Sequence, residues 1–409
     1  MELKKYKLAD IGKVITGKTP STSIAENYAW GTIPFYTPED VAKGLGMMGR
    51  NSRFISKTGF EEIASNTILG ESVLVGCIGS DMGNVAYSNI TCATNQQINA
   101  ITQFKNGIDP LYVYYLLSTM KSYFQKIAGS TTTPILPKSV FEEIEIHLPD
   151  MKKQKDVVSI LYALDRKIEL NKLINDNLEA MAKQLYDYWF VQLDFPNEEG
   201  KPYKSSGGAL VWNEKLKREI PQEWSDCKLK DFINLFDSKR VPLSSKDRGE
   251  RQGVYPYYGA TGIMDYVNDY IFDGDYILLA EDGSTSDAKG FPIVQYIWGK
   301  NWVNNHAHII LPKNERSMMF TYQMLRSIPA KQIETGSIQK KISQENLCGY
   351  KMVLPNSNLL EKYENVVSPL WEKRKRCIEE INTLTKQRDE LLPLLMNGQA
   401  SVNYHLSDD

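Results

Sequence analysis

The sequence predicts an α+β fold with two globular mixed α/β domains and two long antiparallel coiled-coil helices, arranged as an internal repeat with approximate twofold symmetry. Three observations predict it: a segment that occurs twice, a long heptad pattern after each copy, and similar openings of the two halves. The chain of 409 residues is long enough for two to three domains, so each copy has room for a core of its own.

The repeated segment runs from Gly129 to Asp150 and returns in altered form from Gly336 to Asn356. Their offset of 207 (336 − 129) superimposes apolar residues in pairs, Ile135 on Ile342 and Val140 on Leu347. The openings also match, because Tyr6 to Gly12 is similar to Cys227 to Ile233. Each copy is therefore expected to form one structural unit.

Two long heptad patterns follow the two copies, as is typical of coiled-coil helices. Helices of about 35–40 residues span roughly 55–60 Å, and neither can bury its apolar stripe alone. We therefore expect the two helices to pack against each other in antiparallel directions. Asn171 and Arg374 interrupt the stripes and are expected to fix the register. The predicted seam comprises Leu161, Leu164, Ile168, Leu178 and Leu185 in the first helix and Val367, Leu370, Ile381, Leu384 and Leu391 in the second.

The segments before the helices combine short β-rich runs with amphipathic helical patterns. Ser72 to Gly79 and Tyr276 to Gly283 are such runs, and both end in a glycine turn. A polar segment rich in proline and glycine separates the halves. The predicted order is a globular domain at 1–150, a long helix at 151–194, a linker at 195–226, a second globular domain at 227–356, a second long helix at 357–398 and a tail at 399–409.

The composition places few limits on the partner. The formal charge is −2 at pH 7, so charge alone does not favour nucleic acid, whose binding proteins are usually basic. The five cysteines are scattered without a CxxC pair, which favours reduced thiols. No apolar run is long enough to cross a bilayer, and the N-terminus lacks the apolar core of a signal peptide. We therefore expect a cytoplasmic protein without membrane contact.

Motifs for catalysis are missing, because the sequence contains neither GxGxxG nor a P-loop. The tetrapeptide at 109–112, DPLY, differs by one residue from the DPPY motif of adenine-N6 methyltransferases, but we interpret Asp109 as the N-cap of a helix. His306 and His308 share one face of a predicted strand, but without a third ligand we expect no metal site.

Polar loops occupy matching places in the two halves. The segment 95–97, NQQ, corresponds to 304–306, NNH. Such amides either contact adenine edges in a DNA groove or belong to a solvated loop or a buried amide network, and the sequence alone favours the solvated loop or buried network over DNA contact. Residues 16–22 correspond to 238–242, and their hydroxyl groups and basic side chains suit phosphate contacts as well as they suit a flexible loop.

Four motifs carry a resemblance to a known family: KLADIGKVITGKTPST, YAWGTIPFYTPEDV, YPYYGATGI and AEDGSTSD. Together with the repeated segment and the two helices, they resemble the specificity (S) subunit of type I restriction–modification systems over essentially the whole chain. The resemblance implies two target-recognition domains, each contacting one half of a split site in double-stranded DNA. It also implies helices that set the spacing of the half-sites and dock two methyltransferase (M) subunits, with motor–nuclease (R) subunits joining them.

The resemblance further implies that this chain is not an enzyme. S-adenosylmethionine, ATP and Mg are then expected on the partner subunits, and base flipping would belong to those subunits. The alternative is a non-enzymatic coiled-coil scaffold whose lobes bind protein or glycan. Under the family hypothesis the predicted DNA contacts are Thr16, Lys18, Thr19, Tyr36, Thr37, Asn95, Gln96 and Gln97 for one half-site, and Ser238, Lys239, Arg240, Tyr258, Thr261, Asn304, Asn305 and His306 for the other.

Overall fold

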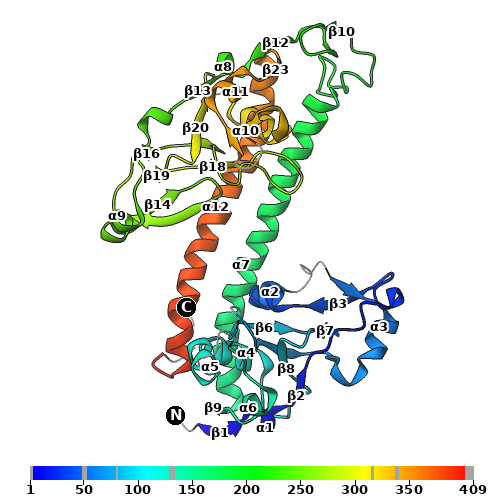
Figure 1. The fold of residues 1–409 in the computed structure, drawn as a ribbon, viewed down its shortest axis with the longest axis vertical. Coiled ribbons are helices and arrows are strands. Elements are labelled where there is room, and N and C mark those ends of the chain that lie inside the picture. Colours follow the sequence, from blue (N-terminus) through cyan, green and yellow to red (C-terminus); the bar gives the residue numbers. More distant parts are fainter. Residues whose placement is uncertain are drawn as a thin grey trace, which may run out of the picture. The chain divides into compact units, whose positions relative to one another are not determined.

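The computed structural model describes residues 3–47, 53–79, 82–128, 134–314, 317–336 and 340–400. The chain divides into two compact units, one formed by Met1–Ile174 with Cys377–Asp409 and the other by Asn175–Arg376. The long helices α7 (Met151–Tyr186) and α12 (Ser357–Met396) each contribute one part to either unit (Figure 1). Among the described residues, no helix has the length and apolar character that a membrane crossing requires.

The first unit is built on a four-stranded antiparallel sheet. Its order is β2 (Lys13–Thr16), β8 (Ile98–Thr102), β5 (Ser72–Gly76) and β6 (Val85–Ser88). A smaller sheet has the order β4 (Phe54–Ile55), β3 (Ile33–Tyr36) and β7 (Ala93–Thr94), with β3 parallel to β7. A two-stranded ribbon joins β1 (Lys4–Lys7) to β9 (Glu145–Leu148).

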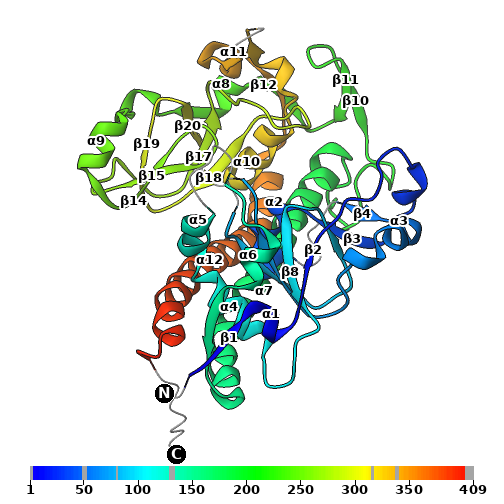
Figure 2. The same ribbon diagram turned by 60° about the horizontal axis from the view of Figure 1, so that its bottom comes forward.

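The helices of the first unit are short except for its share of α7 and α12. They are α1 (Leu8–Ile11), α2 (Pro38–Val41), α3 (Lys57–Glu62), α4 (Pro110–Ser118), α5 (Lys121–Ile127) and α6 (Lys138–Glu142), with 3-10 turns at Ala25–Asn27, Gly44–Met47 and Ala64–Asn66. Tyr115 on α4 donates a hydrogen bond to Asp165 on α7 (Oη–Oδ2 2.7 Å), and α4 lies beside α7 in both views (Figures 1 and 2).

Strand β5 shows why the main sheet of the first unit is stable. All five of its residues are buried, so both faces of the sheet are covered. Val73 and Val75 belong to the cluster that contains Phe141, whereas Leu74 belongs to the cluster that contains Tyr36. This alternation follows the two-residue period of a strand, so β5 supplies the centre of two apolar layers.

The second unit repeats this topology with its own strands. Its main antiparallel sheet has the order β13 (Ile233–Leu235), β20 (Ala307–Pro312), β17 (Tyr276–Ala280) and β18 (Val294–Ile297). The smaller sheet has the order β15 (Ile263–Val267), β14 (Gln252–Tyr258), β19 (Lys300–Val303) and β16 (Phe272–Asp273), with β14 parallel to β19. The ribbon pairs β12 (Ser225–Lys228) with β23 (Lys351–Leu354). The predicted internal repeat is confirmed by this match.

The remaining elements of the second unit cover its sheets or extend its edges. The helices are α8 (Leu229–Phe232), α9 (Ser245–Glu250), α10 (Met318–Ser327) and α11 (Gln344–Gly349), with 3-10 turns at Asp237–Lys239 and Ala330–Gln332 and a π-helical turn at Asp187–Val191 after α7. Two further strand pairs join β10 (Leu210–Asn213) to β11 (Arg218–Pro221) and β21 (Glu334–Thr335) to β22 (Lys341–Ile342).

The structure corrects the predicted pairing of Ile135 with Ile342. The amide of Leu136 donates to Cys77 O (2.9 Å), and the amide of Ile342 donates to Glu281 O (2.8 Å). Leu136 and Ile342 are both buried, whereas Ile135 is exposed. The true offset at this point is therefore 206 (342 − 136).

The same shift applies to the predicted pairing of Val140 with Leu347. Phe141 is buried in the first unit as Leu347 is in the second, and Val140 is exposed. An alignment that is wrong by one residue exchanges inward and outward side chains, so burial identifies the register. Gly129, from which the alignment was counted, lies outside the described residues.

Helices α7 and α12 run in antiparallel directions within the first unit, as predicted. Arg388 donates to Asp165 (Nη1–Oδ1 2.8 Å), and Asn171 donates to Glu380 (Nδ2–Oε2 2.8 Å). A residue that comes later on α7 therefore meets one that comes earlier on α12. Asn171, a polar residue of the heptad stripe, is buried.

The same antiparallel pairing holds within the second unit. Arg374 donates to Glu179 (Nη2–Oε2 2.7 Å), and the Tyr363 hydroxyl donates to Ala182 O (3.2 Å). Arg374 interrupts the apolar stripe and finds a carboxylate on the facing helix. Buried or half-buried positions are occupied by all ten predicted seam residues: Leu161, Leu164, Ile168, Leu178, Leu185, Val367, Leu370, Ile381, Leu384 and Leu391.

Candidate nucleic-acid interface

Three polar segments that are distant in the sequence meet in the first unit. Thr19 donates to Gln96 (Oγ1–Oε1 3.0 Å), which joins the loop after β2 to the turn before β8. The amide of Asn95 donates to Tyr36 O (3.2 Å), which joins the same turn to the end of β3. The segments 16–22 and 95–97 and the end of β3, where Tyr36 and Thr37 were predicted as contacts, therefore lie together.

Glycine is required where the loop after β2 crosses the turn at 95–97. A Cβ atom on Gly17 would lie 2.1 Å from Thr94 Oγ1 and 2.2 Å from Asn95 O, closer than any real contact. The Gly17 amide donates to Ile98 O (3.0 Å), so this backbone lies directly on the turn. The next residue, Lys18, is exposed. The crossing therefore holds a lysine at the surface beside Gln96.

The turn at 95–97 is stiffened by its own amide groups. The Asn95 side chain donates to Gln97 (Nδ2–Oε1 3.0 Å) and accepts from the Gln97 backbone amide (3.1 Å). These two half-buried amides form a local network. Gln96, at the tip of the turn, is exposed. Asn95 and Gln97 therefore support the turn, and Gln96 alone of the three faces solvent.

The second unit builds the same turn from different residues. The amide of Asn304 donates to Tyr258 O (3.0 Å), as Asn95 does to Tyr36. The His306 amide donates to Asn304 Oδ1 (2.8 Å), as the Gln97 amide does to Asn95. Asn305 is exposed at the tip. The two units thus present Gln96 and Asn305 at equivalent positions.

The neighbouring turn at 259–262 is held in place by a side chain of the main sheet. Gln295 on β18 donates through Nε2 to Gly259 O and to Ala260 O, both at 3.0 Å. The Gly259 amide donates to Gly262 O (2.8 Å), which closes the turn. Thr261 is exposed at its tip. Gln295 was not predicted as a site residue, because its contact with 259–260 joins segments about 35 residues apart.

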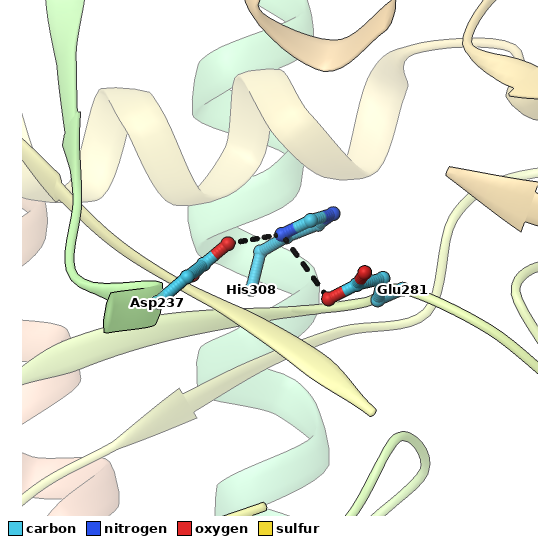
Figure 3. Close-up of side chains that lie close together, drawn as sticks. All are labelled: Asp237, Glu281 and His308. Carbon is cyan, nitrogen blue, oxygen red and sulfur yellow. Dashed lines mark hydrogen bonds and ion pairs between the residues drawn. The ribbon is translucent and has the colours of Figure 1, made fainter. Parts of the chain in front are cut away.

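A buried network of Asp237, Glu281 and His308 (Figure 3) adjoins the turn at 304–306, since the Glu281 amide donates to His306 O. We call the equivalent turns at 95–97 and 304–306 the first and second reading turns. His308 on β20 bonds to Asp237 (Nδ1–Oδ2 2.6 Å) and to Ile342 O (Nε2–O 2.7 Å). Its Nδ1 also lies 3.7 Å from Glu281 Oε2. Since both ring nitrogens face oxygen atoms, the imidazolium form satisfies both contacts.

Arg240 closes this network instead of facing solvent. Its Nη1 donates to Glu281 Oε2 (2.7 Å) and to Ala307 O (2.9 Å), and only 13% of its side chain is exposed. The predicted phosphate contact by Arg240 is therefore not supported, because its guanidinium group is committed to buried acceptors. Lys341 lies 3.2 Å from the other oxygen of Glu281.

The charge network also determines the state of its two carboxyl groups. Burial raises the pKa of Asp237, but hydrogen bonds from His308, Ile309 N and Gln344 and the charge of His308 outweigh it and hold the pKa below its usual value. Burial likewise opposes ionisation of Glu281, and Arg240, His308 and Lys341 together lower its pKa. Both carboxylates are therefore ionised at neutral pH.

The acidic and imidazole ligands of this network are also close enough for a metal site. One ligand atom from each of Asp237, Glu281 and His308 lies within 4.8 Å of the others. From the sequence only His306 and His308 could be paired as metal ligands, because Asp237 and Glu281 follow other strands, β13 and β17. Arg240 and Lys341 already neutralise Glu281, so the arrangement is that of an ion-pair network.

Exposure separates the predicted contacts into buried, half-buried and exposed residues. Tyr36 and Asn304 are buried, so their side chains do not reach the surface, whereas their backbone groups support the reading turns. Half-buried positions are occupied by Thr16, Thr19, Thr37, Asn95, Gln97 and Tyr258. Exposed positions are occupied by Lys18, Gln96, Ser238, Lys239, Thr261, Asn305 and His306.

The methyltransferase-like tetrapeptide is a helix cap, as predicted. Asp109 Oδ1 accepts from the amides of Leu111 (3.0 Å) and Tyr112 (3.1 Å) at the start of α4. Pro110 occupies the first position of the helix, where no amide hydrogen bond is lost.

Comparison with known proteins relates both units to one family. The family described as "Type I restriction modification DNA specificity domain" matches residues 1–180 and 221–362. The type I restriction enzyme MjaIX specificity subunit of Methanocaldococcus jannaschii is 28% identical over 420 residues, covering 97% of this chain and 93% of that protein. The EcoprrI specificity subunit of Escherichia coli is 19% identical over 390 residues, covering 91% and 90%. The crystal structure of the type I S subunit from M. genitalium, 17% identical, shares the fold with a TM-score of 0.61 over 97% and 96% of the chains.

Proposed function

The chain belongs to the type I restriction–modification DNA specificity family, and from this premise we propose that each unit contacts one half of a split site in double-stranded DNA. One observation supports this proposal above the others. The same reading turn, held by the same backbone bonds, occurs in both units with an exposed amide at its tip. Two equivalent readers suit two half-sites.

The exposed side chains divide by chemistry into two kinds of contact. Lys18 and Lys239 supply the charge that attracts phosphate groups, which positions a protein without reading sequence. Gln96 and Asn305 supply amides that can bond to adenine N6 and N7 in the major groove. The lysines therefore contribute affinity, and the amides contribute selectivity.

The chain's partners would perform the reaction. Two methyltransferase subunits would dock on α7 and α12 and carry S-adenosylmethionine, and motor–nuclease subunits would use ATP and Mg. Helices α7 and α12, with 36 and 40 residues, connect the two units and would set the distance between half-sites. This chain would take part in no bond breaking itself.

The direct test is binding of duplex DNA by this chain co-expressed with its methyltransferase subunit. We expect affinity to fall steeply with salt, and the slope of log K against log salt to drop by about 1 for Lys18→Ala and for Lys239→Ala. A protein- or glycan-binding scaffold would show no such duplex binding.

The repeat supplies matched control lysines for this experiment. Lys105 and Lys313 follow the far ends of β8 and β20, and their amides make equivalent bonds to Ile11 O and Phe232 O (both 2.9 Å). Both lysines are exposed but lie beyond the strand ends opposite the reading turns. Lys105→Ala and Lys313→Ala should leave the salt slope unchanged.

A further inference from the structure

The hairpin beside the second reading turn exposes apolar side chains. Strands β14 and β15 pair in the second unit, next to α9 (Figure 2). The exposed fractions are 77% for Val254, 47% for Ile263, 55% for Met264 and 48% for Tyr266. Three of these residues, Ile263, Met264 and Tyr266, lie together on β15, the edge strand of the smaller sheet, and such exposure is unusual for a surface that meets only water.

The opposite face of the hairpin is packed, so this exposure is not a consequence of loose folding. Tyr257 and Val267 are buried against Trp302 on β19. Arg248 on α9 bonds to Asp265 (Nε–Oδ2 3.1 Å) and covers the Tyr257 ring. The hairpin therefore has one packed face, and its other face is packed at Tyr258 but open at Met264 and Tyr266 on β15.

Met264 connects this open face to the reading turn. Its sulfur lies 3.3 Å from Asn304 Nδ2, inside the turn that presents Asn305. The sulfur also covers Gly259, where a Cβ atom would lie only 2.4 Å away. Met264 is thereby fixed between the two turns, although half of its surface stays exposed.

The surroundings of Met264 are polar and basic in a way that suits DNA. Arg240 Nη1 lies 3.3 Å from Asn305 O, so the exposed Lys239 belongs to the same surface as the reading turn. Thr261 is exposed between Gly259 and Met264. An amide, a hydroxyl, a cation and a rigid apolar side chain thus lie together on an edge held by Gln295.

In the major groove, an A·T pair is distinguished by adenine N6 and N7 and by the C5-methyl group of thymine. An amide recognises the first feature, and an apolar side chain recognises the second. We propose that Met264, with Ile263 beside it, contacts the C5-methyl group of a thymine in the half-site of the second unit, next to an adenine contact by Asn305. This inference rests on the proposed function and adds the identity of a base pair to it.

The experiment begins with the methylated motif of the host genome, which gives the half-site of the second unit. Each thymine of that half-site is then replaced by deoxyuridine, which lacks only the methyl group. We expect one replacement to weaken duplex binding about fourfold, equivalent to ~0.8 kcal/mol for one buried methyl group. Met264→Ala should remove this difference between thymine and uracil, whereas Met264→Leu, which keeps an apolar contact, should retain it.

Two controls locate the effect. The first is Val254→Ala, at the end of β14 away from the turn, which should leave the difference between thymine and uracil unchanged. The second uses Met264→Ala with thymines of the first half-site, where the difference should also remain. Two outcomes would overturn the inference and leave the proposed function standing. In the first, the protein binds its sequence but no uracil replacement weakens binding. In the second, a uracil replacement weakens binding equally in the wild-type protein and in Met264→Ala. Loss of methyltransferase docking on Met264→Ala would overturn the inference in favour of a protein contact. Absence of any sequence-specific duplex binding would instead refute the proposed function.

Discussion

His308 occupies in the second unit the position that Asn99 occupies in the first. His308 Nε2 bonds to Ile342 O at 2.7 Å, and Asn99 Nδ2 donates to Leu136 O at 3.4 Å. On the other side, His308 Nδ1 bonds to Asp237, and Asn99 Oδ1 accepts from Thr16, both at 2.6 Å. One position beneath each reading turn is therefore filled by a buried ion pair in one unit and by a neutral pair in the other.

Breaking the ion pair should destabilise the second unit strongly. His308→Asn alone leaves Asp237 buried without its imidazolium partner, and we expect a loss of about 3 kcal/mol in the free energy of unfolding. Asp237→Thr combined with His308→Asn reproduces the neutral pair of the first unit and should recover much of the loss. Urea unfolding measures both variants, and equal losses for the single and the double variant would contradict the assigned pairing.

Acid should weaken the second reading turn before the first. The pKa values of Asp237 and Glu281 are held below their usual values of 3.8 and 4.5, so their stabilisation is complete above about pH 5 and is lost as pH falls through the lowered values. Hydrogen exchange of β20, corrected for intrinsic rates, should therefore accelerate between about pH 5 and pH 2. Strand β8, beside the neutral Thr16–Asn99 pair, serves as the internal control, and equal acid responses of β8 and β20 would contradict the prediction.

The antiparallel helix pairing should appear as energetic coupling between distant residues. Double-mutant cycles of Asp165→Asn with Arg388→Met, and of Glu179→Gln with Arg374→Met, should each give a coupling energy of about 1 kcal/mol or more. The crossed combination of Asp165→Asn with Arg374→Met removes the same types of charge but no shared contact, so its effects should add. Thermal unfolding measures all three cycles, and coupling in the crossed pair alone would require a different helix register.

The two tip amides should affect separate half-sites. Gln96→Ala should relax selection at one base pair of the first half-site and Asn305→Ala at one base pair of the second, each by roughly 1–3 kcal/mol. Binding to a library of duplexes randomised at every position of the motif measures this. Relaxed selection in both half-sites from one variant would mean that the units are not independent readers.

Helix length should control the spacing of the half-sites. Deletion of seven residues from both α7 and α12 shortens each by about 10 Å and should reduce the tolerated gap by roughly three base pairs. Removing whole heptads keeps the apolar seam in register. An unchanged gap in the methylated motif would exclude a spacing role for the helices.

The repeat and the helices were predictable because their signals are periodic. Heptad spacing identifies α7 and α12 from local sequence, and their similar lengths indicate the antiparallel partner. The register of the repeated segment was harder to predict, because Ile135 and Leu136 are both apolar and only burial distinguishes them.

The charged network could not be predicted because its members come from different strands. Asp237, Glu281 and His308 follow or belong to β13, β17 and β20, and no sequence spacing joins them. The sequence nevertheless contained one indication of a buried charge. Asp237 aligns with Thr16 at the offset of 221 (237 − 16) that aligns the two openings. A carboxylate that replaces a threonine at a strand end requires a compensating cation, and His308 supplies it.

The most direct test of the central claim is the methylated motif produced by a chimera. The residues before Phe141 are replaced by those of a relative with a different specificity, and the methylated sites of a host that carries the chimera and the methyltransferase subunit are mapped. If each unit contacts its own half-site, one half of the motif changes and the other half stays as it was. A motif that changes in both halves, or in neither, would contradict the account.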